Sequence, residues 1–361
     1  MDLPNLNDLI EEQFIVYDQP PEQNLFVAGP PGSGKTSLAV MRAVFLKNKG
    51  LKTVLITRNK LLAELGKQLG SDGIETSTLS SFIWHSYKAD IGQEVPQFTS
   101  YVYDWDQIIA NYAAINFSPA LDHLIVDEGQ NLPAGFFKWA YRYGAKSLTV
   151  FADEDQTTDA QRSSLNDICN AGLPAPIRLK VNHRNTAEIA DVAEHFHRLQ
   201  KLPPGVVQRG RGGELPRMTA LKTWDELASL ASTRLTNRNE AIGIIVYLQD
   251  EVLLLRQKLV DLLPSGTRVD AYVSKIGAAS GIRLLQPGIT ILSSESAIGL
   301  EFNTVYLQDL WRSLPCSSVD DFRRMYMLCA RARDNLILID GPHTLSQSQI
   351  ADLPGPELLE R

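Results

Sequence analysis

The stretch Asn24–Ser37, NLFVAGPPGSGKTS, decides the fold of the first half of this chain. Its first part, Asn24–Ala28, is a short apolar run that predicts a buried strand, and helical periodicity begins at Ser37. Between them, Gly29–Thr36 (GPPGSGKT) matches the glycine-rich pattern GxxxxGK[ST]. A strand, such a loop and a helix in this order are typical of a phosphate-binding loop.

The residue types in this loop point to MgATP as the ligand. Its glycines let the backbone turn so that amide groups surround phosphate oxygens, and the helix N-terminus adds the positive end of its dipole. We expect Lys35 to reach the β- and γ-phosphates and the Thr36 hydroxyl to bind Mg²⁺. The predicted nucleotide contacts are Gly29, Pro30, Pro31, Gly32, Ser33, Gly34, Lys35, Thr36 and Ser37.

A second acidic element lies at 123–133, HLIVDEGQNLP. Its apolar start predicts a buried strand that ends at Asp127 and Glu128, and ligands of open α/β sheets bind at the carboxyl ends of strands. Asp127 suits Mg²⁺, and Glu128 suits a general base that activates water. A small-molecule kinase has no evident use for the second carboxylate, so the pair favours ATP hydrolysis.

Short β-branched runs and helical segments alternate along the rest of the chain, which predicts an α/β fold with mostly parallel sheets covered on both faces. With 361 residues, the length favours two domains. The Pro/Gly-rich stretch Ala171–Ile177 marks the expected boundary, giving domains 1–174 and 175–361 with a small insertion near 84–117. We expect Leu202–Pro216 to be a surface loop carrying Arg209 and Arg211, with Arg217 beside it. Gly341–Arg361 is predicted to be a tail or a docked terminal helix.

The strands are expected at Asn24–Ala28, Thr53–Thr57, His123–Val126, Ser147–Phe151, Ala241–Tyr247, Ile289–Leu292, Thr304–Leu307 and Leu336–Ile339. The helices are expected at Ser37–Lys49, Lys60–Leu69, Thr186–Leu199, Thr223–Leu235 and Val252–Leu263.

Composition narrows the classes of partner. The formal net charge of −7 argues against a general nucleic-acid coat or a protein of anionic membranes, although it leaves room for one local basic groove. The three cysteines are odd in number and widely spaced, which favours buried reduced thiols over a zinc site. No apolar run approaches the roughly 20 residues of a membrane span. We expect a cytoplasmic protein without a membrane partner.

Further motifs follow the phosphate-binding loop in a consistent order. They are LITRNKLLAEL (55–65), TLSSF (78–82), VDEGQ (126–130), FADEDQ (151–156), LKVNHRNTAEIA (179–190), SAIGLEF (296–302) and RRMYMLCARARDNLILI (323–339). Together they resemble the core of UvrD/Rep-like superfamily 1 DNA/RNA helicases over nearly the whole chain.

The resemblance implies two RecA-like domains, each a mostly parallel sheet flanked by helices, with ATP at their interface. It implies that Gln13, which lies 16 positions before Gly29 (29 − 13), reads adenine and that Glu301 contacts the ribose. The first domain would supply the catalytic residues Lys35, Asp127, Glu128 and Gln156, with Thr36 and Asp127 holding the metal. The second would supply Arg184 and Arg331 to the γ-phosphate, where a planar cation stabilises the transferring group.

The chain departs from this family in the residues that would contact a nucleic-acid strand, here called the nucleic-acid track. The large second insertion is absent, and Gln156 is followed by no aromatic residue before Ile168 that could stack on a base. Glu295 and Ile298 stand where the family usually has His and Lys. The track that remains consists of Thr57, Arg58, Asn59, Thr78, Ser81 and, by resemblance, Ser293.

Two other groups of residues, one aromatic and one acidic, are predicted to have structural roles. The cluster Tyr101, Tyr103 and Trp105 could stack bases, but packing in a core is favoured, and Asp153–Asp155 is predicted to be a turn at a strand end. Two functions therefore remain open. One is a compact ATPase that couples hydrolysis to single-stranded DNA or RNA as a helicase or translocase. The other is a helicase-derived ATPase switch that acts on a protein partner.

Overall fold

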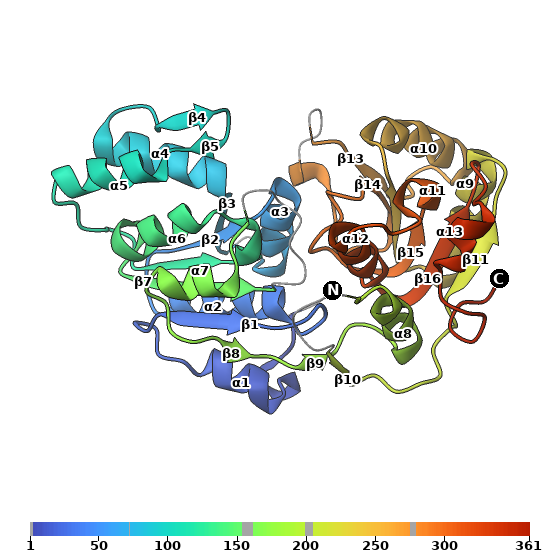
Figure 1. Ribbon diagram of the computed structural model, residues 1–361, viewed down its shortest axis with the longest axis horizontal. Coiled ribbons are helices and arrows are strands. Elements are labelled where there is room, and N and C mark those ends of the chain that lie inside the picture. Colours follow the sequence, from blue (N-terminus) through green and yellow to red (C-terminus); the bar gives the residue numbers. More distant parts are fainter. Residues whose placement is uncertain (1–2, 72, 154–161, 199–204, 275–278) are drawn as a thin grey trace. The chain divides into compact units, whose positions relative to one another are not determined.

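The computed structural model of this protein describes residues 3–71, 73–153, 162–198, 205–274 and 279–361 (Figure 1). The chain divides into two compact units. The first consists of Gly34–Leu179 with the preceding residues up to Pro30, and the second consists of Lys180–Arg361 together with Pro31–Ser33.

The first unit is built on a six-stranded sheet in which every described pairing is parallel, with strand order β3-β2-β6-β7-β1-β8. The strands are β1 Leu25–Ala28, β2 Thr53–Thr57, β3 Glu75–Thr78, β6 His123–Val126, β7 Ser147–Ala152 and β8 Ile177–Arg178. Every residue of β1, β6 and β7 is buried, as expected for parallel strands covered on both faces. The flanking helices are α1 Glu11–Tyr17, α2 Lys35–Asn48, α3 Lys60–Leu69, α6 Ala134–Trp139 and α7 Leu165–Asn170.

The small insertion of the first unit contains α4 Leu79–Ile91, a hairpin of β4 Gln97–Thr99 and β5 Val102–Tyr103, and α5 Trp105–Ala114. It is held by an aromatic core rather than by a sheet. Tyr112 stacks on Tyr143 with ring centroids 5.5 Å apart and meets Trp139 edge-on, while Trp105 packs against Phe136. Such offset and edge-to-face pairs add to the free energy gained by burying the rings.

The second unit repeats the architecture, with parallel strands in the order β11-β16-β15-β12-β14-β13. The strands are β11 Arg217–Ala220, β12 Ala241–Val246, β13 Val269–Tyr272, β14 Gly288–Ser293, β15 Phe302–Leu307 and β16 Ala332–Asp340, and a separate pair is formed by β9 Val181–Asn182 and β10 Val206–Val207. The helices are α8 Ala187–His195, α9 Trp224–Arg238, α10 Gln249–Leu262, α11 Leu310–Ser313, α12 Val319–Cys329 and α13 Gln347–Ala351. Its core is largely isoleucine and leucine from β12, β14, α9 and α10.

The predicted fold class is confirmed: two parallel six-stranded sheets are each flanked by helices, consistent with two RecA-like domains. Some local expectations need correction. Arg217 begins strand β11, and β10 interrupts the stretch predicted to be a surface loop. The C-terminal segment is docked, because the Met218 amide donates to Glu360 O at 2.7 Å and Leu359 is fully buried.

Two further features are the burial of the cysteines and the character of the helices. Cys329 is buried, whereas Cys169 and Cys316 are only half-buried, so the expectation of three buried thiols is wrong for two of them. Within the described segments of the chain, no helix combines the length and the apolar character needed to cross a membrane.

Candidate nucleotide site

The loop between β1 and α2 has the backbone that its glycines predict. Gly32 and Gly34 have φ of +77° and +85°, values that residues with a side chain adopt only at a cost in free energy. Helix α2 begins directly after Gly34 and has no side-chain cap, whereas α3 and α4 are capped by Asn59 and Thr78. The first amide groups of α2 are therefore left without the side-chain acceptor that the other two helices have, which suits an anion.

Lys35 is buried at the start of α2, with 6% of its side chain exposed. Its Nζ donates to Gly29 O at 2.6 Å and Pro30 O at 2.8 Å, and it lies 3.4 Å from Asp153 Oδ2. The ammonium group is thus folded back onto the loop and satisfied by protein acceptors. Asp153 is 1% exposed and directly follows the end of β7, whereas the other two residues of the predicted turn lie outside the described residues.

Three strand ends bring the acidic residues to the loop. Strands β6, β7 and β1 are neighbours in the sheet, and Asp127, Asp153 and Gly29 directly follow their carboxyl ends. Because the strands are parallel, these residues lie at the same edge. The signal for Asp153 was in the sequence, since it follows a buried apolar strand in the same way as Asp127.

Asp127 is a buried carboxylate without hydrogen-bond partners. Its side chain is 1% exposed, and neither carboxylate oxygen forms a hydrogen bond with any described residue. Burial raises the pKa of Asp127 above its usual range, and the charge of Glu128 raises it further. The Thr36 hydroxyl, Lys35 and the Glu128 amide lie close enough to oppose that rise in pKa, although neither the hydroxyl nor the amide reaches hydrogen-bond geometry.

These groups fit a magnesium ion. A hard divalent cation prefers oxygen ligands, and Mg²⁺ commonly takes one or two protein oxygens with water and substrate phosphates as the rest. Asp127 and the Thr36 hydroxyl are two such oxygen donors close together. The described residues contain no cluster of three or more His, Cys, Asp or Glu side chains suited to a metal, so an all-protein cage is absent from that part of the chain.

Glu128 is held in an unusual backbone conformation. Its φ of +57° lies in the left-handed region, which non-glycine residues rarely occupy and which often marks functional sites. Gln130 fixes its side chain: Gln130 Nε2 donates to Glu128 Oε2, and Gln130 Oε1 accepts from the Asp153 amide at 2.9 Å. Sequence reasoning assigned no role to Gln130, which the structure shows to be fully buried between the two acidic strand ends.

Gln13, which the resemblance assigns to adenine, lies beside the loop. It is 7% exposed on α1, and a Cβ atom added at Gly34 would come within 2.8 Å of Gln13 Nε2. Its Oε1 accepts from the Ile10 amide at 3.4 Å. Spacing along the chain could suggest this neighbourhood, but only the packing of α1 shows it.

The second unit places its predicted site residues in two surroundings. Arg184 Nε donates to the Glu301 carboxylate, and the two side chains are 12% and 14% exposed. The residues expected at the γ-phosphate and the ribose are therefore an ion pair. Arg331 is 1% exposed, and it donates to Met327 O at 2.8 Å and to Leu300 O at 3.3 Å. Gln156 lies outside the described residues.

Comparison with known proteins adds little detail to this site. No family model matches the sequence, and no curated protein matches it. Among solved structures, the chain is similar to the C-terminal domain of a possible DNA helicase from Lactobacillus plantarum WCFS1. The identity is 21% and the TM-score 0.35, and the match covers 49% of this chain and 96% of the other.

Proposed function

We propose that this chain is a helicase-like ATPase that binds and hydrolyses MgATP and couples turnover to single-stranded DNA or RNA. The observation that carries the proposal is the Asp127 carboxylate. It is buried and without hydrogen-bond partners among the described residues, and it lies next to the first turn of the helix that follows the phosphate-binding loop. Burying an ionised carboxylate without partners costs free energy unless a cation binds to it.

In this proposal, Lys35 changes partners when nucleotide binds. Its ammonium group would leave the carbonyl oxygens of Gly29 and Pro30 for the β- and γ-phosphates, exchanging neutral acceptors for charged ones. Thr36 and Asp127 would hold Mg²⁺, which supplies charge neutralisation on the phosphates when bound. Gln13 would recognise the adenine from its place beside Gly34.

Glu128 is the proposed general base. Its carboxylate would accept a proton from the attacking water, and Gln130 would keep one of its oxygens oriented. Arg184 and Arg331 are assigned to the γ-phosphate by the resemblance. Since Arg184 is paired with Glu301, that role requires Arg184 to exchange or share its carboxylate partner.

The test is the ATP turnover of the purified chain, alone and with single-stranded DNA or RNA. We expect magnesium-dependent hydrolysis that rises when a single strand is added. Lys35→Ala should abolish nucleotide binding or turnover, because the point charge on the phosphates is lost. Near-normal hydrolysis by Lys35→Ala would refute the assignment of the loop.

A protein-directed ATPase switch is the second candidate, and one observation favours it. In the segment that resembles the family's fifth motif, Ile298 is buried and contributes to the core, while Glu295 is exposed and would repel phosphate. ATP turnover that does not respond to DNA or RNA would make this second function the better one.

A further inference from the structure

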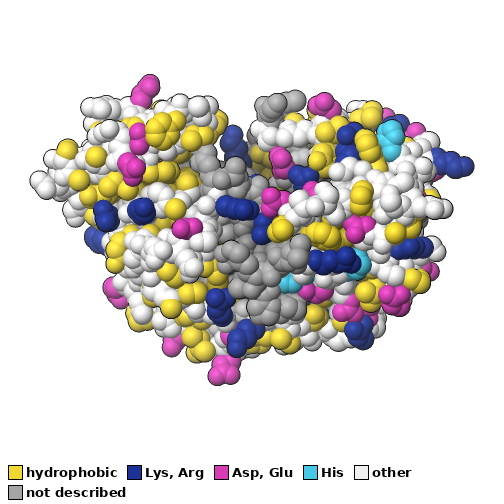
Figure 2. Space-filling view, viewed as in Figure 1, with side chains coloured by type: hydrophobic (Ala, Val, Ile, Leu, Met, Phe, Trp, Pro, Cys, Tyr) yellow, Lys and Arg dark blue, Asp and Glu magenta, His cyan; other side chains and the backbone are white. Residues whose placement is uncertain are grey.

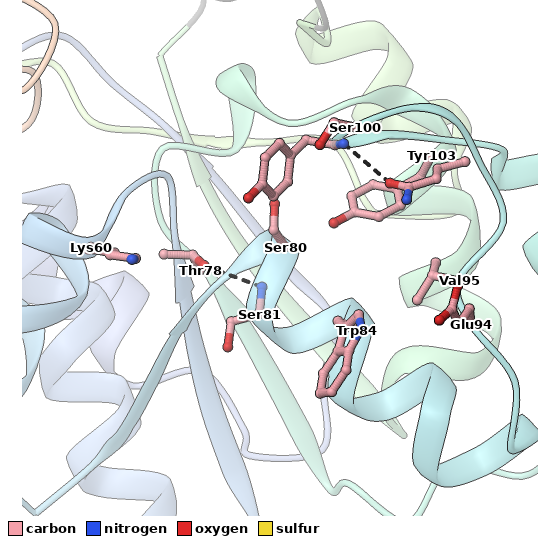
Figure 3. A pocket seen from close by; sticks show the side chains of 11 residues that line it. Lys60, Thr78, Ser80, Ser81, Trp84, Glu94, Val95, Ser100 and Tyr103 are labelled. Atoms are coloured by element: carbon pink, nitrogen blue, oxygen red, sulfur yellow. Dashed lines mark hydrogen bonds between the residues drawn. The ribbon is translucent and has the colours of Figure 1, made fainter. Parts of the chain in front are cut away.

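A cavity of about 570 Å³ lies in the small insertion of the first unit, between the start of α4 and the β4–β5 hairpin (Figure 3). Figure 3 shows Thr78, Ser81 and Trp84 along α4 and its N-terminus, with Ser100 and Tyr103 on the hairpin side. The volume falls within the roughly 300–1,000 Å³ typical of ligand pockets. All the lining residues belong to one unit, so the cavity is complete by itself.

The cavity has aromatic walls that are open to solvent. Trp84 is 45% exposed and Tyr101 69% exposed, and both line the cavity, as does the more buried Tyr103. The predicted packing role holds for Tyr103 and Trp105, which belong to the hydrophobic core, but not for Tyr101. In Figure 2, hydrophobic side chains gather on the surface over α4, α5 and the hairpin.

The hairpin presents Tyr101 at a cost in backbone free energy. Thr99 pairs with Val102, so Ser100 and Tyr101 form the turn, and Tyr101 has a φ of +66°. Glycine and asparagine adopt this conformation more readily than an aromatic residue. An aromatic side chain held at such a position, and left exposed at a cavity, is an arrangement that folding alone does not require.

The polar side chains that line the cavity suit one nucleotide of a single-stranded nucleic acid. Hydroxyl groups of Thr78, Ser80 and Ser81 lie at the start of α4, and the ammonium group of Lys60 lines the same cavity. Hydroxyls and a single cation are groups that position a sugar–phosphate backbone, while an aromatic face accepts any base. Glu94 adds an acceptor for the amino or hydroxyl hydrogens of a base or sugar.

We propose that this cavity binds a nucleobase of a single-stranded nucleic acid, with Trp84 and Tyr101 as the stacking surfaces. The inference deepens the proposed function, because it names where the single strand is held. It also supplies an aromatic contact that the sequence lacks after Gln156. The site resides on the hairpin of the insertion rather than on that segment.

The experiment measures the affinity of a fluorescently labelled oligothymidylate by anisotropy, without nucleotide. Trp84→Ala should weaken binding roughly 5- to 150-fold, the range that loss of one stacked base produces. Trp84→Phe should recover most of the affinity, because a flat ring remains. Phe98→Ala is the matched control: Phe98 is 72% exposed on the same hairpin but does not line the cavity, so its affinity should stay near that of the wild type.

A second variant separates binding from folding. Tyr101→Asn places a residue that tolerates positive φ at the turn, so it should leave thermal stability unchanged or higher while lowering affinity for the oligonucleotide. A stable Tyr101→Asn with wild-type affinity would overturn the role of Tyr101.

Base recognition is tested with an abasic strand of the same length. The wild type should bind the abasic strand more weakly than oligothymidylate, and Trp84→Ala, which keeps only Tyr101 as a stacking surface, should show a smaller difference between the two strands. Equal loss of affinity for both strands, or no effect of Trp84→Ala, would overturn the stacking proposal even if the chain hydrolyses ATP. Conversely, a chain that shows these binding differences but no ATP turnover would refute the proposed ATPase and leave the base site standing.

Discussion

The buried imidazole of His123 should make the stability of the first unit depend on pH. His123 is fully buried at the start of β6, where its Nδ1 lies 2.9 Å from Pro21 O and its Nε2 lies 2.7 Å from Thr149 Oγ1. Because a carbonyl oxygen only accepts, Nδ1 must carry the proton. Nε2 is then the acceptor for the Thr149 hydroxyl, whose oxygen in turn accepts from Arg42 Nε at 3.0 Å.

Protonating this imidazole would break the chain of donors and acceptors. A proton on Nε2 would face the Thr149 oxygen, which already accepts from the buried guanidinium of Arg42. Burial, followed by the charge of Arg42, lowers the pKa of His123 from 6.5 to about 4. The unfolded chain therefore binds a proton at a higher pH than the folded chain does.

The sign and the size of the effect follow from these two values. The contribution of neutral His123 to the free energy of unfolding is fully present above pH 6.5. It decreases as the pH falls from 6.5 towards 4, and below pH 4 it decreases no further. Between pH 7 and pH 5, the linkage relation gives a loss of about 2 kcal/mol in the free energy of unfolding. The same network anchors the segment that carries Gln13, since Arg42 also donates to Gln19 O and Pro20 O.

The measurement is urea unfolding at both pH values, followed by circular dichroism, for the wild type and His123→Gln. The variant should be less stable at pH 7 but should lose about 2 kcal/mol less than the wild type on acidification. His343→Gln, at an exposed position, is the control and should keep the wild-type pH dependence. An identical pH dependence in the wild type and His123→Gln would refute the reasoning.

The remaining predictions concern the candidate nucleotide site. Glu128→Gln should keep ATP binding but stop hydrolysis, because the amide preserves the shape of the side chain and cannot accept a proton. A normal rate constant for hydrolysis in single-turnover assays would show that Glu128 is not the base. Gly34→Ala should lose about 1–2 kcal/mol of stability and weaken nucleotide binding, since φ is +85° and the new Cβ meets Gln13. Gly50→Ala has a similar φ of +79° and open space around it, so it should share the stability loss in thermal unfolding without affecting binding in calorimetry. Arg184→Ala should lower the turnover number by about 10³ or more while leaving ATP affinity nearly intact. Arg331→Ala should also lower stability by about 1–3 kcal/mol, because two buried carbonyl oxygens lose their donor; equal stability of the two variants would count against that difference.

The secondary structure was predictable where apolar runs were long enough to be buried. The strands at Thr53–Thr57 and His123–Val126 have the predicted bounds. Strand β3, Glu75–Thr78 (ETST), was missed because it contains no apolar residue and lies at the edge of the sheet, where burial is incomplete. Strands β11 and β13 were missed for a related reason, since both are edge strands: no residue of β11 is buried, and in β13 only the first and last residues are.

The sequence alone was enough to predict a glycine-rich loop between a strand and a helix, and to predict that the acidic pair follows the end of a strand. In each case a strand, a turn and the functional side chains are adjacent in the chain, so local backbone geometry places them with no help from distant residues. The glycines at positive φ follow from the eight residues Gly29–Thr36 themselves, whereas α2 begins at Lys35, two residues before the predicted start at Ser37. The two-domain α/β class followed in the same way, from the alternation of strands and helices.

The partners of these residues were decided only by the tertiary structure. Lys35 and Asp153 are 118 positions apart, and they meet because β7 lies beside β1 in the sheet. The link through Gln130 depends on the packing of β6 against β7, and the cavity beside Trp84 depends on how the hairpin folds over α4. No local pattern encodes strand order or the packing of a hairpin, because both arise from burying apolar surface contributed by segments far apart in the sequence.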